Sequence, residues 1–219
     1  MSSEKSRAEN SKKNLHEADF TGTDLKEADL SSGVLIGACL KDADLSEADL
    51  CEADISSANF SDARLHRTLL YRSRARDASF LRATLTQANL VEANMNSADF
   101  SHANLKESDI EGADLTNSKF INADLSDTNM TGVFLSNADL SGADFSGAEL
   151  IATDLTDSNL TGANFKNTYM NHANLSGANL QQAINLTQDQ IETTFITKET
   201  LFPDNLTIVW ISDTEYEFG

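Results

Sequence analysis

The chain has 219 residues and a formal net charge of −19, from 35 acidic and 16 basic side chains. A charge of this sign and size repels nucleic acids and anionic membranes, so we expect no direct binding to either. Two cysteines are too few for a disulfide-built secreted scaffold, and neither a secretory signal nor a membrane span is apparent, so a cytoplasmic protein is expected.

The chain divides into three segments. Residues 1–14 are polar and are expected to form a mobile tail or a short cap. Residues 15–183 carry a regular repeat. Residues 184–219 leave the repeat and are expected to form a C-terminal cap or a dimerisation segment.

The repeat has a period of five. From Leu15 to Leu180 a large apolar residue occupies every fifth position, with Ala75 as the exception, and a small residue, mostly alanine, lies two residues before each of them. A period of five fits neither a helix nor a strand, since it would place the apolar residues of an α-helix about 140° apart. It is typical of a solenoid in which each five-residue unit makes one side of a coil. Eight glycines lie two residues after a core position, where a turning chain can use positive φ.

Two further patterns indicate four units, or 20 residues, per coil. Five phenylalanines share one 20-residue phase and two share another: Phe20, Phe60, Phe80, Phe100 and Phe120, and then Phe145 and Phe165. Five of the six arginines between 64 and 82 follow an acidic residue by 20 positions. The pairs are Arg64 with Asp44, Arg67 with Glu47, Arg72 with Glu52, Arg74 with Asp54, and Arg82 with Asp62. Since adjacent coils lie about 4.8 Å apart, each pair is predicted to be in vertical contact.

The units resemble the pentapeptide repeat family, whose motif is A-(D/N)-L-x-x. Examples are ADLSE (43–47), ADLCE (48–52), ANLVE (88–92), ADLSG (138–142) and ANLSG (173–177). The resemblance covers about three quarters of the chain. It implies an all-β fold, a right-handed quadrilateral β-helix of about eight coils and roughly 40 Å, with the Leu/Phe and Ala positions pointing inward and a short C-terminal helix and strand cap.

The C-terminal segment shows its own signals. Thr187 to Gln190 has the spacing of a capping box and predicts a short helix near 188–194. A turn is expected around Pro203, a strand over 207–211, and a tail over 212–219. This segment either covers the open apolar end of the rod or dimerises through Phe202, Trp210 and Ile211. The chain is therefore expected to be a monomer or a homodimer.

The sequence shows no catalytic constellation. The four histidines fall in different 20-residue phases, and the acidic residues are regularly spaced. Metal-ligand spacings, phosphate loops and nucleophile motifs are missing from the sequence. We therefore expect no enzyme activity, no cofactor and no catalytic or metal site. Cys39 and Cys51 fall on different faces and are expected to remain free thiols.

Two outward surfaces are candidate binding sites. The first, called the basic collar, consists of Arg64, Arg67, Arg72, Arg74, Arg76 and Arg82 with Tyr71. It either binds a partner, next to an apolar patch of Leu69, Tyr71, Val91 and Cys51, or only neutralises acids on the preceding coil. The second, called the acidic edge, consists of Asp24, Asp29, Asp44, Asp49, Asp109, Asp124, Asp127, Asp144 and Glu149. It either imitates the phosphates of DNA or only keeps the rod soluble.

Two functions follow from these interpretations. The first is a non-enzymatic protein–protein interaction scaffold that presents a rigid acidic rod. The second, suggested by charge, shape and resemblance to quinolone-resistance pentapeptide proteins, is a DNA mimic. Such a protein would bind a type II topoisomerase, DNA gyrase, or another DNA-binding protein, and would inhibit or protect it.

Overall fold

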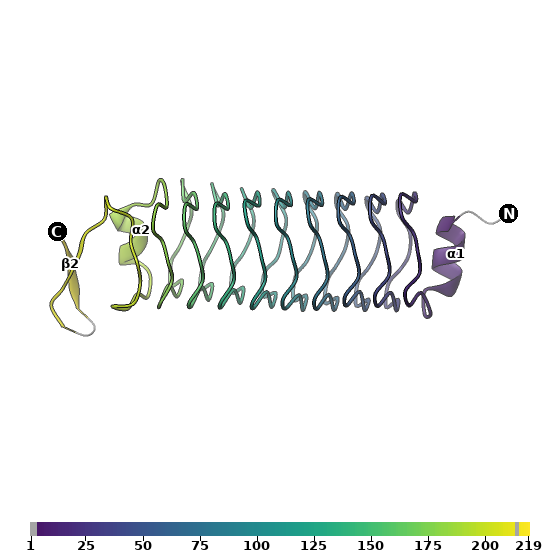
Figure 1. The fold of residues 1–219 in the computed structure, drawn as a ribbon, viewed down its shortest axis with the longest axis horizontal. Helices are drawn as coiled ribbons and strands as arrows, with labels where there is room; N and C mark the ends of the chain where they lie inside the picture. The colour runs from purple at the N-terminus through teal and green to yellow at the C-terminus, as the bar shows by residue number, and fades with distance from the viewer. Residues whose placement is uncertain (1–3, 213–214) are drawn as a thin grey trace.

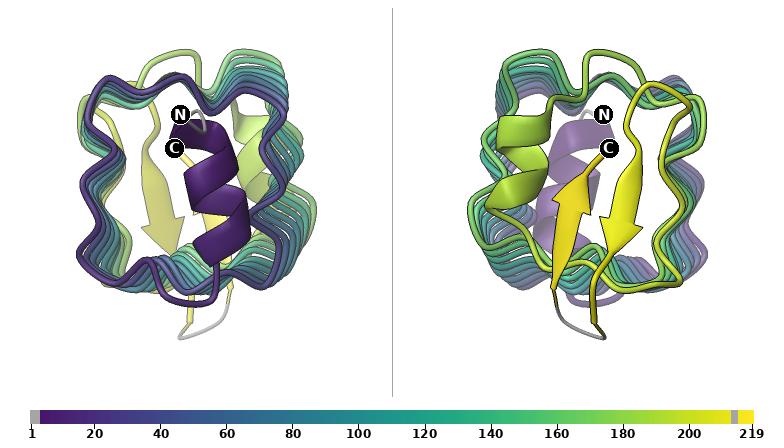
Figure 2. Two further views of the ribbon diagram at one scale, coloured as in Figure 1. Left: turned by 90° about the vertical axis from the view of Figure 1, so that its right-hand side faces the viewer. Right: turned by 90° about the vertical axis from the view of Figure 1, so that its left-hand side faces the viewer.

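The computed structural model describes residues 4–212 and 215–219 as an elongated stack of coils, with a helix at one end and a helix and hairpin at the other (Figure 1). Parallel single-residue bridges join positions 20 residues apart, from Asp19 and Cys39 to Asn164 and Ile184. Viewed along its axis, the stack is four-sided (Figure 2). The 20-residue spacing of vertical neighbours is confirmed.

The regular strands lie outside the repeat. They are β1 (Ile208–Trp210) and β2 (Tyr216–Phe218), whereas the described part of the repeat contains isolated bridges separated by two-residue turns. An all-β class in the ordinary sense is therefore only partly correct. The sides of the coils are too short for extended strands because a turn interrupts the chain in every unit of five residues.

Each turn uses a left-handed residue. The residue two positions after each core residue has positive φ in every unit from Glu17 to Gln182, and the eight predicted glycines lie there at φ of +64° to +72°. Most turns nevertheless hold a residue with a side chain, at a cost of roughly 1 kcal/mol or more per residue. Backbone bonds across the turn, such as Ala18 N–H to Leu15 O at 3.1 Å, and bonds between coils offset this cost.

The motif's Asp or Asn has a structural role in these turns. Its Oδ1 accepts the backbone N–H two residues later, as in Asp49 with Cys51 (2.8 Å) and Asn59 with Ser61 (2.9 Å). Asp and Asn side chains stabilise tight turns in this way. The bond explains why either residue, but few others, precedes the buried leucine.

The interior is filled by the two apolar series. The core leucines and phenylalanines are almost completely buried. The rings of Phe60, Phe80, Phe100 and Phe120 stack with centroids 4.6–4.9 Å apart, and Phe145 stacks on Phe165 at 5.4 Å. The predicted aromatic columns are confirmed for these residues. Phe20 shares the first column but is separated from Phe60 by Leu40.

Helix α1 (Glu4–Ser11) lies across the first coil (Figure 2, left). Ala8 is completely buried, and Lys12 Nζ bonds to Asp29 Oδ1 at 2.6 Å. Glu9 Oε1 accepts the backbone N–H of Asp29 at 3.2 Å. For the described part of residues 1–14 these contacts favour a cap over a mobile tail; residues 1–3 lie outside the described part.

The C-terminal segment continues the stack before leaving it. Helix α2 (Gln188–Glu192) begins with the predicted capping box, in which Thr187 and Gln190 exchange bonds between side chain and backbone. Gln190 Nε2 also donates to the carbonyls of Phe165 and Thr168, both at 2.9 Å. Phe195 and Leu201 then pair with the preceding coil. The register slip at Leu186 thus makes room for a helix on one side of the last coil.

A hairpin lies across the C-terminal end (Figure 2, right). The turn at Pro203 is confirmed by the bond from Leu206 N–H to Pro203 O at 3.0 Å, and β1 confirms the strand predicted over 207–211. The tail predicted over 212–219 is wrong, because β2 pairs antiparallel with β1. Residues 213–214 lie outside the described part of the chain.

Candidate interaction surfaces

The acidic edge is interrupted along the rod. Asp24 and Asp44 are vertical neighbours, as are Asp124 and Asp144, but Arg64 and two neutral residues separate the two pairs. In the next column, Leu69 and Asn89 separate Asp49 from Asp109. The acidic residues therefore form two short arrays, one on each side of the basic collar.

Most of these carboxylates are also engaged by the backbone. Every aspartate of the acidic edge except Asp127 accepts the N–H of the residue two positions later, at 2.8–3.2 Å. Asn129 and Asn164 additionally donate their side-chain amides to Asp109 and Asp144, at 3.0 and 2.9 Å. One oxygen of each of these aspartates is therefore occupied by the fold, and the outer oxygen faces a partner.

Asp44 does not lie on the surface as predicted. It is only 7% exposed, and its Oδ2 contacts Arg64 Nε at 3.0 Å and Lys26 Nζ at 3.2 Å. Burial by itself would raise the pKa of Asp44, but hydrogen bonds from Ser46, Arg64 and Lys26 lower it to about 2. Asp44 is thus the buried anchor of a local ion-pair network.

The Asp44 network predicts a pH-dependent stability difference. Because the pKa of Asp44 is depressed on folding, its charge stabilises the fold above about pH 4, and this contribution is lost as pH falls through about 2. Asp44→Asn, which can keep the turn bond, is expected to reduce the free energy of unfolding by about 1–2 kcal/mol at pH 7 and by nearly nothing at pH 2. Urea unfolding across this range measures the difference.

Asp124→Asn is the matched control for this measurement. Asp124 makes the same turn bond, to Ser126 at 3.0 Å, and belongs to none of the ion pairs found among the described residues. Its replacement should therefore change stability little at any pH. A cost for Asp44→Asn that stays constant from pH 7 to pH 2 would show that the charge of Asp44 is not what stabilises the fold.

Three arginines of the basic collar contact the predicted acids. Arg64 reaches Asp44, Arg74 Nη2 reaches Asp54 Oδ2 at 3.2 Å, and Arg82 Nε reaches Asp62 Oδ1 at 2.6 Å. The hydrogen bond from Arg82 lowers the pKa of Asp62. These pairs support the structural interpretation, although pairs as exposed as these contribute only about 0–1 kcal/mol each.

Two arginines turn to the following coil instead. Arg67 Nε donates to Gln87 Oε1 at 2.8 Å, not to Glu47, and Arg72 Nε contacts Glu92 Oε2 at 2.6 Å, not Glu52. Both arginines stand at turn corners, where a long side chain can reach either neighbouring coil. Arg72 also lies over the Tyr71 ring, 4.9 Å from its centroid.

Arg76 lies beside its sequence neighbour Asp77, at 3.5 Å. Cys51, Tyr71 and Val91 of the predicted apolar patch are half-buried vertical neighbours, and Leu69 is exposed. Both cysteines are free, and burial, with the nearby Asp49, raises the pKa of the Cys51 thiol to about 11. The collar thus combines exposed guanidinium groups with a small apolar surface.

The three candidate dimerisation residues differ in exposure. Phe202 is half-buried and packs on the core, and the Trp210 ring lies edge-on to Tyr216 at 5.6 Å. Ile211 is exposed, as is Val209 in the same hairpin. Two of the three side chains are therefore engaged within the chain, and only Ile211 is available for a second copy.

Within residues 4–212 and 215–219, no three His, Cys, Asp or Glu side chains are grouped so as to hold a metal ion. Among the helices of the same residues, none is sufficiently long and apolar to cross a membrane.

The stacked four-sided coils and the filled apolar interior define a solenoid protein. A sequence profile of pentapeptide repeats matches this chain in eight copies, over residues 11–35, 34–67, 78–117, 108–147, 118–157 and 148–184. The chain therefore belongs to the pentapeptide repeat family, as the motif predicted. Residues 68–77, in the middle of the basic collar, fall outside the matched segments.

Solved structures of similar fold include QnrB1, a plasmid-mediated fluoroquinolone resistance protein. A trypsin-treated variant of QnrB1 is 19% identical over 85% of this chain and 89% of its own, with a TM-score of 0.71. The full-length form is 15% identical, covering 85% and 92%, with a TM-score of 0.58. HetL, from the cyanobacterium Nostoc sp. strain PCC 7120, is 29% identical over 89% and 93% of the chains, with a TM-score of 0.44. No curated protein matched.

Proposed function

We propose that the chain is a right-handed four-sided β-helix that acts as a cytoplasmic, non-enzymatic scaffold for protein–protein interaction. The observation that carries the proposal is the fixed outward register: every fifth side chain has the same inward or outward direction, and each has a vertical neighbour 20 residues away. The interior is occupied by Leu, Phe and Ala. Binding specificity therefore resides in outward columns of side chains held by a rigid backbone.

The partner is a protein with a cationic surface, since the chain carries a net charge of −19. The C-terminal half of the acidic edge is the best-formed surface for it: Asp109, Asp124, Asp127, Asp144 and Glu149 follow one another without an intervening arginine. The basic collar serves as a second, local contact. Its departure from the repeat motif at residues 68–77 and its exposed arginines support this assignment.

Affinity capture with matched variants tests this proposal. One variant removes charge from the edge (Asp109→Asn, Asp124→Asn, Asp127→Asn, Asp144→Asn, Glu149→Gln), and the other removes the collar (Arg72→Ser, Arg74→Ser, Arg76→Ser). We expect a partner retained by the wild-type chain to be lost with at least one variant, with a melting temperature nearly unchanged. Recovery of the same proteins with all three chains would contradict the proposal.

DNA mimicry directed at DNA gyrase is the second candidate. The likeness to QnrB1 shows the fold alone, and what favours this candidate is the outward placement of the edge carboxylates on a narrow rod. Against it stands the basic collar, which divides the acidic edge. A gyrase supercoiling assay, with and without a quinolone, decides between the two. Neither inhibition nor protection at micromolar protein would exclude DNA mimicry of gyrase and leave the scaffold proposal intact.

A further inference from the structure

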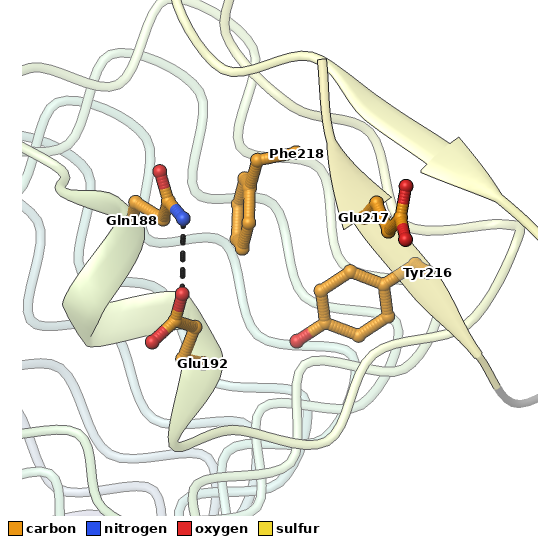
Figure 3. A pocket seen from close by; sticks show the side chains of 5 residues that line it. All are labelled: Gln188, Glu192, Tyr216, Glu217 and Phe218. Carbon is orange, nitrogen blue, oxygen red and sulfur yellow. Dashed lines mark hydrogen bonds between the residues drawn. The ribbon is translucent and has the colours of Figure 1, made fainter.

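A groove separates α2 from β2 at the C-terminal end of the rod (Figure 3). It encloses about 500 Å³ and is lined by Gln188 and Glu192 from α2 and by Tyr216, Glu217 and Phe218 from β2. Across this end, β2 lies between α2 and β1 (Figure 2, right). The edge of β2 that is not paired with β1 therefore faces the groove.

The hydrogen-bond pattern of the hairpin leaves this edge open. Ile211 N–H donates to Glu215 O and Gly219 N–H to Thr207 O, both at 2.9 Å, and Val209 stands opposite Glu217. Because hydrogen-bonded and non-hydrogen-bonded pairs alternate in an antiparallel ladder, positions 215, 217 and 219 bond to β1. The backbone N–H and C=O of Tyr216 and Phe218 then point toward the groove. An unpaired strand edge of this kind is a template for a further strand.

The side chains around the groove select a positively charged occupant. The rings of Tyr216 and Phe218 lie edge to face, 5.7 Å apart, beside the Glu192 carboxylate (Figure 3). Burial, with the charge of Glu192, raises the pKa of Tyr216. No basic side chain lines the groove among the described residues. Lys198 is the one basic residue in the sequence from 184 to 219, against seven acidic residues. A carboxylate next to aromatic rings suits an ammonium or guanidinium group.

We infer that this groove binds an extended, lysine- or arginine-containing segment of a partner protein, which adds to β2 as a third strand. The backbone of the segment pairs with Tyr216 and Phe218, and its basic side chain reaches Glu192. A second copy of the chain fits less well, since its own β2 carries the same carboxylates and would bring like charges together. The groove is separate from the acidic edge, so its occupancy does not depend on the proposed function of the rod.

A labelled seven-residue peptide of alternating lysine and valine provides the probe, with fluorescence anisotropy as the measurement. Glu192→Gln is expected to raise the Kd about fivefold, the effect of losing one partly exposed charge pair. Glu199→Gln is the matched control, because Glu199 is an exposed acid of the same segment outside the groove lining. Its Kd should equal that of the wild-type chain. Methylating alternate backbone nitrogens of the peptide keeps its charge but blocks strand pairing, and should abolish binding.

Hydrogen exchange supplies a readout that charge alone would not change. Bound peptide should slow exchange of the Tyr216 and Phe218 amides and leave those of the distant turns unaffected. Equal binding of the methylated peptide, or an equal loss with Glu199→Gln, would overturn the inference in favour of nonspecific attraction. A concentration-dependent dimer that protects the same two amides and excludes the peptide would overturn it in favour of a second copy.

Discussion

Replacing Phe100 with alanine is expected to lower the free energy of unfolding by about 3–5 kcal/mol. Phe100 is completely buried, and its ring stacks on Phe80 at 4.6 Å and on Phe120 at 4.8 Å, with planes within 4° of parallel. The substitution removes the apolar surface of the ring, leaves a cavity and breaks both ring contacts. Urea unfolding followed by circular dichroism measures the loss.

Leucine substitutions separate stacking from burial. Leucine fills most core positions, so Phe100→Leu leaves a smaller cavity than alanine but still removes both ring contacts. Phe20→Leu is the matched control, because Phe20 is as fully buried and its vertical neighbour is Leu40. Phe100→Leu should cost about 1–3 kcal/mol more than Phe20→Leu, the contribution of two aromatic contacts. Equal costs would show that the column contributes only burial.

The spacing of residues was sufficient to predict most of the fold. The five-residue period assigns each residue to the inside or the outside, and the phenylalanine and arginine phases add the 20-residue coil. Both follow from local geometry, since a unit that turns one corner must repeat at every corner. The C-terminal helix was equally readable, because a capping box such as Thr187 to Gln190 is a local signal.

The contacts on the surface were less predictable. Arg72 has an acid 20 residues before it and another 20 residues after it, so spacing alone cannot tell which it contacts. The stacking on Tyr71 accompanies the bond to Glu92, and only side-chain conformation shows it. Burial of Asp44 depends likewise on cations from two different coils, Lys26 and Arg64.

Two terminal elements were missed for different reasons. β2 could have been found, because Glu215 to Phe218 alternates charged and aromatic residues, the pattern of a half-buried strand. The open groove beside it follows only from the placement of α2, β2 and β1 across the end of the rod. Helix α1 gave no comparable signal, since Ala8 is its one buried residue and its stability depends on contacts with the first coil.

Deleting a single residue is expected to be more damaging than deleting a whole coil. Removal of residues 101–120 takes out one 20-residue coil and brings residue 121 to the place of residue 101, so every later residue keeps its face and its inward or outward direction. We expect this shortened chain to fold cooperatively. Removal of Asn117 alone moves every later core residue out of phase, and we expect the C-terminal half to lose its folded structure. Circular dichroism and limited proteolysis measure both outcomes.

A five-residue deletion distinguishes the two periods. Removing residues 116–120 keeps every later leucine inside but moves each later unit to the neighbouring face, so that vertical pairs such as Asn129 with Asp109 are lost. This chain should fold with lower stability than the full-coil deletion and should lose binding that depends on the acidic edge. If it bound a partner as tightly as the wild-type chain, the columns of outward side chains would not be the recognition surface. The period of five thus determines folding, whereas the period of 20 determines which surface a partner meets.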